Sequence, residues 1–377
     1  MNNNSFIPVN EPLLNGKEKE YINQAIDSGW ISSEGPFVRE FEKKFSSKVN
    51  RKFGIAVCNG SAALEVAVNA IGIKAGDEVI MPNFTIISCA LPVVRIGAKP
   101  VLIDADPFTF NMNVENIESK ISDKTKAIMV VHIYGLPVDM DPILSLAKKY
   151  NLKIIEDAAE MQGQTYKGKP CGSFGDVSTF SFYPNKLITT GEGGVVVTDD
   201  EDIAEKSISL RNLYFDKDRK YIHEELGYNF RMTNLQAAIG LAQLDRYEEF
   251  IQKKRKIGYL YNQYLENIPQ IQLPVKNTDY AENIYWVYGI VLKDNLSIIS
   301  DNIIELLKSK NIGARHFFYP MSKQPVFLKL GLFENENYPE SEKLAEKGFY
   351  IPSGMALEEE QIERVAKVLK EISDEYF

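Results

Sequence analysis

Seven short apolar runs between residues 53 and 198 are the feature that most constrains the fold of this chain. They are rich in Val, Ile and Phe and apolar at successive positions, which is typical of strands buried on both faces of a sheet. Amphipathic stretches at 61–72 and 139–150 lie between some of them. Strands that alternate with helices predict a mostly parallel sheet with helices on both faces. The runs cover residues 53–58, 78–82, 99–104, 126–132, 152–157, 178–182 and 193–198.

The pattern changes near residue 250. A long helix is expected from about Met232, where Thr233 and Gln236 can form a capping box. After about residue 255 the sequence predicts a smaller α+β unit, with a strand at 284–292 and helices at 300–313 and 358–372. We therefore predict a large domain over 1–250 and a small C-terminal domain over 251–377, with the N-terminal segment packed against the small domain.

Composition and charge exclude several classes of protein. A net charge of −9 argues against nucleic-acid binding, which needs a basic surface. Cys58, Cys89 and Cys171 are too widely spaced for a disulfide framework or a zinc site, so we expect free thiols and no metal. The first residues lack the charged and apolar regions of a signal peptide, and the longest apolar run, 127–131, is too short to span a bilayer. We therefore expect a cytoplasmic protein that does not bind a membrane.

One lysine, Lys186, stands in a segment that carries no other charge before Glu192, "SFYPNKLITTGEGG" at 181–194. A lysine placed in the core has a lowered pKa, because burial disfavours its charged form. Its neutral amine can then attack a carbonyl carbon. The alternative interpretation is a structural lysine paired with Glu192.

Two other predicted strands end in residues that suit a ligand. Open α/β sheets bind ligands at the carboxyl ends of their strands. Glu156 and Asp157 end an apolar strand, where a carboxylate needs a partner; it is either a helix cap or the partner of a cationic ring nitrogen. Gly60 and Ser61 open a helix, either as a plain cap or as a phosphate site. A phosphate site, an acid and a nucleophilic lysine together indicate pyridoxal 5'-phosphate (PLP) as cofactor.

Motifs spread over nearly the whole chain resemble the DegT/DnrJ/EryC1/StrS family of sugar aminotransferases. The resemblance implies a fold type I PLP-dependent aminotransferase of the α/β class. Its large domain would hold a mostly parallel seven-stranded sheet, and its smaller C-terminal domain would be α+β. The motifs are "ISSEGPFVREFEKKF", "VVHIYGLPVDM" (130–140), "EDAAE" (156–160), "GDVSTFSFYPNKLITTGEGG" (175–194) and "LGYNFRMTNLQAAIGLAQL" (226–244).

The family resemblance also implies roles for the charged residues. Lys186 would bond to the cofactor aldehyde and later move a proton between cofactor and substrate. Asp157 would pair with the pyridine nitrogen and keep it protonated. Glu160 stands where many members have a glutamine near the cofactor's phenolic oxygen. Because a carboxylate would repel a phenolate, one of the two groups must carry a proton.

The cofactor phosphate would be held by residues from two subunits. The resemblance assigns this role to the backbone of Gly60 and Ser61, the hydroxyl of Ser181, and the side chain of Asn229 from a partner subunit. It therefore implies a homodimer whose active sites are shared across the interface.

Two positions depart from the family pattern. Ile86 stands where an aromatic residue often stacks on the pyridine ring, and Phe84 is an alternative cover. Ser322 replaces a histidine that lies near the acceptor in the family. Arg315 and Tyr319 match the family and would contact the acceptor, or else they are an ordinary surface arginine and a packed tyrosine.

The implied reaction moves an amino group from L-glutamate to a keto group of a nucleotide-linked sugar, for surface polysaccharide (O-antigen) biosynthesis. The forms "WISSEGPFV", "NKLITTGEGG" and "FFYP" are most similar to the branch that converts GDP-4-keto-6-deoxymannose to GDP-perosamine.

Four other interpretations of the sequence compete with this reaction. The departures at Ile86 and Ser322 support the same chemistry on a UDP- or dTDP-linked keto sugar, a 3-keto sugar or a small phosphorylated ketone. A non-catalytic, PLP-binding regulatory protein is a further alternative, which the intact Lys186 and Asp157 disfavour. A sugar dehydratase is disfavoured because such members replace the lysine with histidine. A dinucleotide-binding fold is excluded because "CNGSAAL" (58–64) lacks G-x-G-x-x-G.

Overall fold

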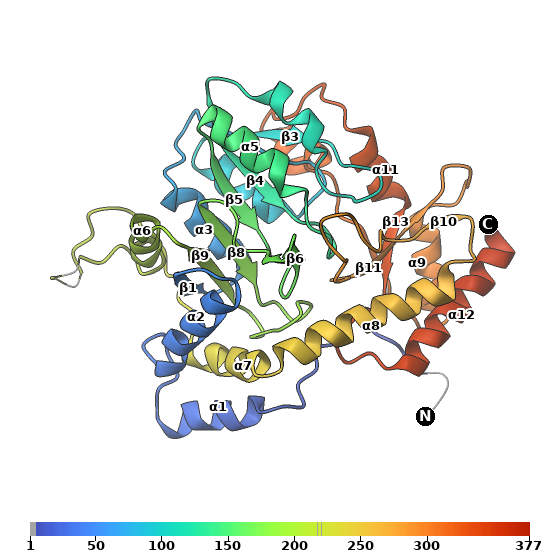
Figure 1. The fold of residues 1–377 in the computed structure, drawn as a ribbon, viewed down its shortest axis with the longest axis horizontal. Coiled ribbons are helices and arrows are strands. Elements are labelled where there is room, and N and C mark those ends of the chain that lie inside the picture. Colours follow the sequence, from blue (N-terminus) through green and yellow to red (C-terminus); the bar gives the residue numbers. More distant parts are fainter. Residues whose placement is uncertain (1–4, 217, 220) are drawn as a thin grey trace.

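The computed structural model describes residues 5–216, 218–219 and 221–377. A large sheet with helices on both sides forms one part of the molecule, and a small sheet with its own helices forms the other (Figure 1). The fold class predicted from the sequence is confirmed.

The large sheet contains seven strands within the described residues. Each of the seven apolar runs is a strand whose ends differ from the prediction by at most one residue. Strand β9 runs antiparallel to both of its neighbours, while the other pairings are parallel. In spatial order the strands are β1 (Phe53–Val57), β9 (Gly194–Thr198), β8 (Val177–Ser181), β5 (Lys153–Asp157), β4 (Thr125–Val131), β2 (Glu78–Pro82) and β3 (Lys99–Ile103).

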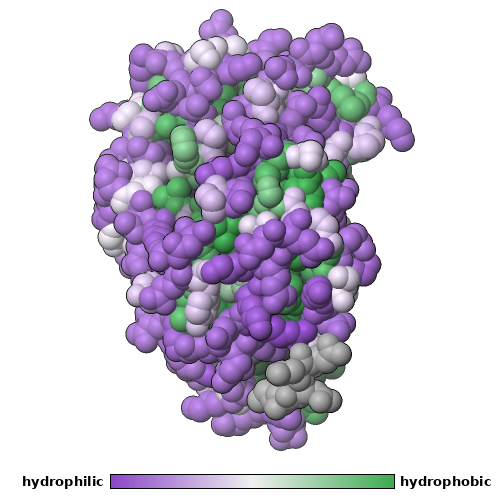
Figure 2. Space-filling model, turned by 90° about the vertical axis from the view of Figure 1, so that its right-hand side faces the viewer, coloured by the Kyte–Doolittle hydropathy of each residue, from purple (hydrophilic) through white to green (hydrophobic). Residues whose placement is uncertain are grey.

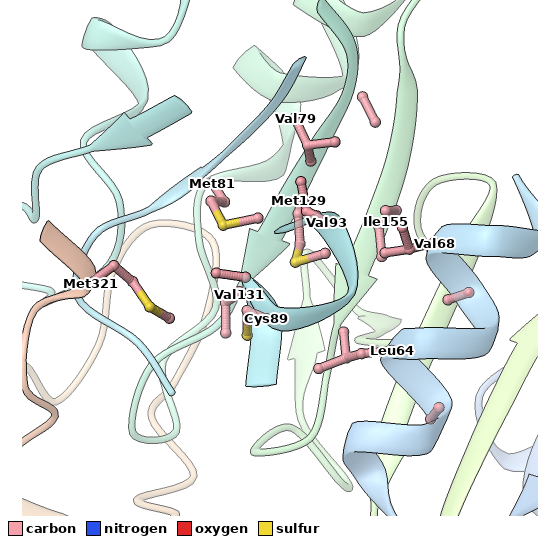
Figure 3. Packing of buried hydrophobic residues seen from close by; sticks show 14 of the residues in the cluster. Leu64, Val68, Val79, Met81, Cys89, Val93, Met129, Val131, Ile155 and Met321 are labelled. Atoms are coloured by element: carbon pink, nitrogen blue, oxygen red, sulfur yellow. The ribbon is translucent and has the colours of Figure 1, made fainter. Parts of the chain in front are cut away.

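Both faces of this sheet are buried, which explains the uninterrupted apolar runs. Val79 and Met81 of β2 pack in one apolar cluster, which also holds residues of helix α3 (Figure 3). Ile80, between them, packs in a second cluster with residues of α2 and α5. Successive side chains of a strand point to opposite faces, so every position in such a strand must be apolar.

Helices flank the large sheet and connect its strands. The described helices of this part are α1 (Glu18–Asp27), α2 (Pro36–Lys48), α3 (Gly60–Ala70), α4 (Leu91–Arg95), α5 (Met140–Tyr150), α6 (Glu201–Arg211) and α7 (Asn234–Leu244). Short elements are the 3₁₀ turns η1 (Ile87–Cys89), η2 (Val114–Asn116) and η3 (Glu118–Lys120), and the hairpin of β6 (Thr165–Tyr166) and β7 (Lys169–Pro170).

The small part contains an antiparallel four-stranded sheet with the order β10, β11, β13, β12. Its strands are β10 (Ile271–Gln272), β11 (Tyr288–Leu292), β12 (Arg315–His316) and β13 (Gly348–Ile351). Its helical elements are α9 (Ser300–Ser309), η4 (Met321–Lys323), α10 (Pro325–Lys329), α11 (Pro339–Lys347) and α12 (Glu359–Tyr376).

Two predicted elements of the small part differ from the structure. The strand expected at 284–292 begins only at Tyr288, because Tyr285 has a positive φ of 54° that ends extended pairing. The helix expected at 300–313 ends at Ser309, and Asn311, with φ 59°, leads out of it before Gly313.

The helix expected from Met232 is divided in two. Thr233 and Gln236 form the predicted capping box at the start of α7. The chain breaks after Leu244, and α8 (Tyr247–Leu265) continues toward the small sheet (Figure 1). Because α8 passes through residue 250, no helix boundary marks that position, and the division there stays a prediction.

The N-terminal segment contacts the small part. Ile7 pairs with Ile312 in a parallel bridge, and the N–H of Gly313 donates to the Ile7 carbonyl at 2.8 Å. The N–H of Ser353 donates to the Val9 carbonyl at 3.1 Å. These bonds tie the start of the chain to residues far along the sequence.

No helix among the described residues is long and apolar enough to cross a membrane. On the face shown in Figure 2, hydrophilic residues dominate, and apolar residues are visible in the recesses between them.

Candidate active site

A cavity of about 440 Å³ lies at the carboxyl edge of the large sheet. Strands β1, β2, β4, β5 and β8 all point toward this edge, so the segments that follow them meet there. Seven residues that the sequence analysis singled out line the cavity: Gly60, Ser61, Ile86, Asp157, Glu160, Ser181 and Lys186.

Lys186 lies in the loop that joins β8 to β9. Its N–H donates to the Tyr183 carbonyl at 2.9 Å, and its Nζ lies 3.9 Å from the ring centre of Trp286. Burial lowers the pKa of the Lys186 amine, while the charges of Glu160 and Asp157 act in the opposite direction. The site therefore makes the amine at this wall of the cavity easier to deprotonate than that of an exposed lysine.

Asp157 is buried at the end of β5. Its Oδ1 accepts from the Ala159 N–H at 3.1 Å and the Thr179 hydroxyl at 3.4 Å, and its Oδ2 accepts from the Cys89 thiol at 3.3 Å. Burial raises the pKa of Asp157, and hydrogen bonds from Ala159 and Cys89 oppose this. The three donors are neutral, which leaves the carboxylate able to pair with a cation in the cavity.

Glu160 lines the same cavity. Its Oε2 accepts from the Tyr134 N–H at 2.6 Å. Burial raises the pKa of Glu160 to about 8, and the nearby Lys186 amine limits the rise. Glu160 therefore holds a proton at neutral pH and can donate a hydrogen bond to an anionic oxygen.

The N-terminus of α3 forms one end of the cavity. The Asn59 side chain caps the helix by accepting from the Ala62 N–H at 2.8 Å. A Cβ at Gly60 would lie 2.8 Å from Cβ of Ser181, so only glycine allows this close approach. The hydroxyls of Ser61 and Ser88 lie 2.8 Å apart and both residues line the cavity. A helix N-terminus with hydroxyls beside it suits an anion such as phosphate.

Ile86 lines the cavity and is 44% exposed. Phe84 is fully buried instead, with its ring against Tyr134, Phe317 and Phe318. The alternative that Phe84 covers the ligand is therefore wrong, because the bend after β2 turns its ring into the aromatic core.

Four predicted residues are outside the cavity lining of this single chain: Asn229, Arg315, Tyr319 and Ser322. Asn229 accepts from Arg231 Nε at 2.9 Å, while Arg315 and Tyr319 are exposed. Ser322 is 3% exposed, and its N–H donates to Asn83 Oδ1 at 2.8 Å.

Several cavity residues had no sequence signal that we used. Trp286 comes from the small part, covers Lys186, and donates from Nε1 to the Asn185 carbonyl at 2.9 Å. Tyr183 and Ser88 also line the cavity. The sequence predicts a strand over 284–292 that includes Trp286. The alternation of side chains along a strand does not say which face of it borders the cavity.

A second polar cluster lies behind β5, around Glu156. Its oxygens accept from the N–H groups of Gly172 and Phe174 at 2.5 and 2.9 Å, and from the Ser178 hydroxyl at 2.9 Å. His132 Nε2 lies 3.1 Å from Oε1. His132, Glu156 and Cys171 are residue types that can bind a metal ion. Their ligand atoms lie within 4.8 Å of one another. Protein donors already fill the Glu156 oxygens, which indicates a structural role.

Comparison with known proteins decides the family. The model of the DegT/DnrJ/EryC1/StrS aminotransferase family matches residues 12–370. This chain belongs to the DegT/DnrJ/EryC1/StrS aminotransferase family. It is therefore a PLP-dependent aminotransferase, and the family identified from the sequence motifs is confirmed.

Individual relatives cover nearly the full chain. It is 41% identical to a GDP-perosamine synthase of Escherichia coli O157:H7 over 97% of this chain and 98% of that protein. It is 42% identical to a GDP-perosamine synthase of Caulobacter vibrioides with the same coverage. A Streptococcus pneumoniae protein assigned as a sugar aminotransferase, solved in its PLP form, has a TM-score of 0.92 at 27% identity, covering 99% of this chain and 100% of that one.

The cavity fits the family's cofactor. Asp157 offers a buried carboxylate without a cationic hydrogen-bond donor, and Lys186 offers an amine whose pKa is lowered by burial. Gly60 gives a close backbone approach at the phosphate-like end. These three features match the ring nitrogen, the aldehyde and the phosphate of PLP.

Proposed function

We propose that this chain transfers an amino group from L-glutamate to the keto group of GDP-4-keto-6-deoxymannose, which gives GDP-perosamine for a surface polysaccharide. The observation that carries the proposal is the meeting of Lys186, Asp157 and Glu160 in one cavity. The acceptor is supported by the two relatives named GDP-perosamine synthase. Bound PLP supplies an aldehyde and a ring that stabilises negative charge on a substrate carbon.

Lys186 is the nucleophile and the proton carrier. Its amine would bond to the aldehyde carbon of the cofactor with loss of water. Once displaced by the incoming amino group, Nζ would take a proton from the substrate carbon and deliver it to that cofactor carbon. Trp286 over Nζ restricts the amine to one wall of the cavity.

Asp157 and Glu160 would act on two other atoms of the cofactor. Asp157 would accept a hydrogen bond from a protonated ring nitrogen, which would balance the charge there. Glu160, with its pKa near 8, donates to the phenolic oxygen. Ile86 covers the ring with an aliphatic side chain, which packs against it without π-stacking.

The cofactor phosphate is held by the backbone of Gly60 and Ser61, by the Ser181 hydroxyl, and by Asn229 of the partner subunit. This requires a homodimer. Exposed apolar side chains support an interface: Tyr183 at the cavity is 50% exposed, and Tyr221 and Leu226, in the segment between α6 and α7, are 78% and 95% exposed. That segment projects from the body (Figure 1).

Mixed dimers test the shared site. Lys186→Ala and Asn229→Ala are each expected to lose most activity as homodimers. After subunit exchange, a hybrid has one site with Lys186 intact and an intact Asn229 opposite it. Activity should therefore return in the mixture, whereas no recovery would mean that Asn229 acts within its own subunit.

Arg315 and Tyr319 are the proposed contacts of the acceptor, since both are exposed and free to meet a large anionic substrate. Ser322 favours a second candidate, the same chemistry on a UDP- or dTDP-linked keto sugar or a small phosphorylated ketone. It replaces the family's acceptor-side histidine and is buried. The three free cysteines fit a reducing, cytoplasmic compartment.

An acceptor panel tests the proposal. The enzyme loaded with an amino group from glutamate is incubated separately with GDP-4-keto-6-deoxymannose, UDP- and dTDP-4-keto sugars, and dihydroxyacetone phosphate. Mass spectrometry then detects the aminated product. Amination of the GDP sugar alone supports the proposal, and amination of another acceptor alone transfers support to the second candidate.

A further inference from the structure

Cys89 is the feature of the site that neither the motifs nor the proposed reaction uses. It is fully buried and ends the turn η1, far in sequence from β5. Figure 3 shows it in the apolar cluster that also holds Val131 and Leu64. Its sulfur nevertheless lies 3.3 Å from Oδ2 of Asp157.

The hydrogen bond has a defined direction. Burial raises the pKa of the Cys89 thiol, and the negative charge of Asp157 raises it further, so the proton stays on sulfur. The Thr85 hydroxyl lies 3.7 Å from the same sulfur. A thiol has one proton, and the carboxylate is the stronger acceptor, so Cys89 donates to Asp157 and accepts from Thr85.

The two carboxylate oxygens of Asp157 accept hydrogen bonds from different parts of the chain. Oδ1 of Asp157 accepts from the Ala159 N–H and the Thr179 hydroxyl, which belong to its own strand region and its neighbour β8. Oδ2 accepts from Cys89. The thiol is therefore the donor that ties the acid to the segment after β2.

Ile86, the proposed cover of the cofactor ring, immediately precedes the same turn. The Cys89 N–H donates to the Ile86 carbonyl at 3.2 Å, and Ile86 lines the cavity. A bond from Cys89 to Asp157 thus fixes the acid and the cover relative to each other.

We propose that Cys89 is a positioning residue, which orients Asp157 through a thiol hydrogen bond and, as a weak donor, keeps that carboxylate more basic than a hydroxyl would. This rests on the proposed role of Asp157 toward the ring nitrogen. The other ionisable groups that face Asp157 are Lys186, Glu160 and His132, and none is changed in the test.

The test is the pH titration of the absorbance of bound PLP, with no sugar acceptor present. Removing the donor in Cys89→Ala makes Asp157 a stronger base, which draws the proton away from the ring nitrogen. The pKa of the bound cofactor, measured from this absorbance titration and called the absorbance pKa below, is then expected to rise by about 0.3–1 unit. PLP should also bind more weakly. Cys89→Ser has a stronger donor and should restore affinity, with an absorbance pKa at or below that of the wild type.

Cys171→Ala is the matched control, because Cys171 is also a fully buried free thiol but contacts the Glu156 side of β5. It should leave the absorbance pKa unchanged. Cys89→Val, which fills the space without a donor, replaces the alanine variant if that does not fold. An unchanged absorbance pKa in the alanine and valine variants, or an identical shift in Cys171→Ala, overturns the proposal. Failure of the acceptor panel alone would leave it standing.

Discussion

Strand β5 ends in two adjacent carboxylates, Glu156 and Asp157, whose surroundings differ. Both are buried, and they point to opposite faces of the sheet because successive residues of a strand alternate. Glu156 is surrounded by protein donors: two backbone N–H groups, a hydroxyl and an imidazole. Asp157 has three neutral donors and borders the cavity. The protein alone supplies the hydrogen-bond partners of Glu156, whereas Asp157 can also pair with a ligand in the cavity.

The largest expected effect is on the rate of amino transfer, when Asp157 but not Glu156 is replaced by its amide. Asp157→Asn should lower the rate of amino transfer about 10²–10³-fold, because an amide cannot balance the charge of a cationic ring nitrogen. The substitution keeps the shape of the side chain, so the free energy of unfolding should change little. Steady-state kinetics and urea unfolding measure the two quantities. A wild-type rate would remove the distinction between the acids.

Glu156→Gln should show the reverse pattern. The amide nitrogen would face a backbone N–H of Gly172 or Phe174, and a buried donor left without an acceptor costs about 1–3 kcal/mol. We expect that loss in urea unfolding, with kcat of the folded protein nearly preserved. Strong loss of kcat at unchanged stability would show that the cluster behind β5 takes part in the chemistry.

Glu160, a third buried acid, should make the free energy of unfolding depend on pH. Its pKa of about 8 in the folded state lies above the 4.5 of an exposed glutamate. Between these values the folded protein binds a proton that the unfolded chain has lost, so the free energy of unfolding falls as pH rises and levels off above about pH 8. Glu160→Gln has no such proton. Its stability relative to the wild type should increase by on the order of 4 kcal/mol from about pH 5 to about pH 9.

Urea unfolding of the cofactor-free proteins measures this difference. Parallel stability curves for the variant and the wild type would show that Glu160 is not held protonated by the fold.

The smallest expected effect concerns the cavity cover. Ile86→Phe supplies the aromatic face that the chain lacks, and should tighten PLP binding about 2- to 10-fold. Titration of the cofactor-free protein measures the affinity. Ile208→Phe is the control, since Ile208 is similarly exposed on α6 and does not line the cavity. Equal effects of both variants would assign the gain to general surface changes.

The parts of this molecule that could be predicted from sequence are those with a local signature. Burial on both faces makes each strand of the large sheet a continuous apolar run. Lys186 and Asp157 stood out because a charge in an apolar segment needs a reason. The break between α7 and α8 gave no signal, because the apolar stripe continues through Tyr247.

The rest of the site depends on contacts between distant segments. The positive φ of Tyr285 turns Trp286 onto Lys186, and a non-glycine residue in that conformation leaves no pattern. The contact of Cys89 with Asp157 joins the turn η1 to the end of β5, so spacing could only suggest a packed thiol.

The most direct test of the account is the absorbance of the PLP-loaded protein after addition of L-glutamate alone. The wild type should convert to the pyridoxamine form, whereas Lys186→Ala should not reach that form, because glutamate can still bond to the cofactor but no amine is present to move the proton. No conversion by the wild type would contradict an aminotransferase and favour a binding role. Conversion by Lys186→Ala at the wild-type rate would show that another group carries the proton.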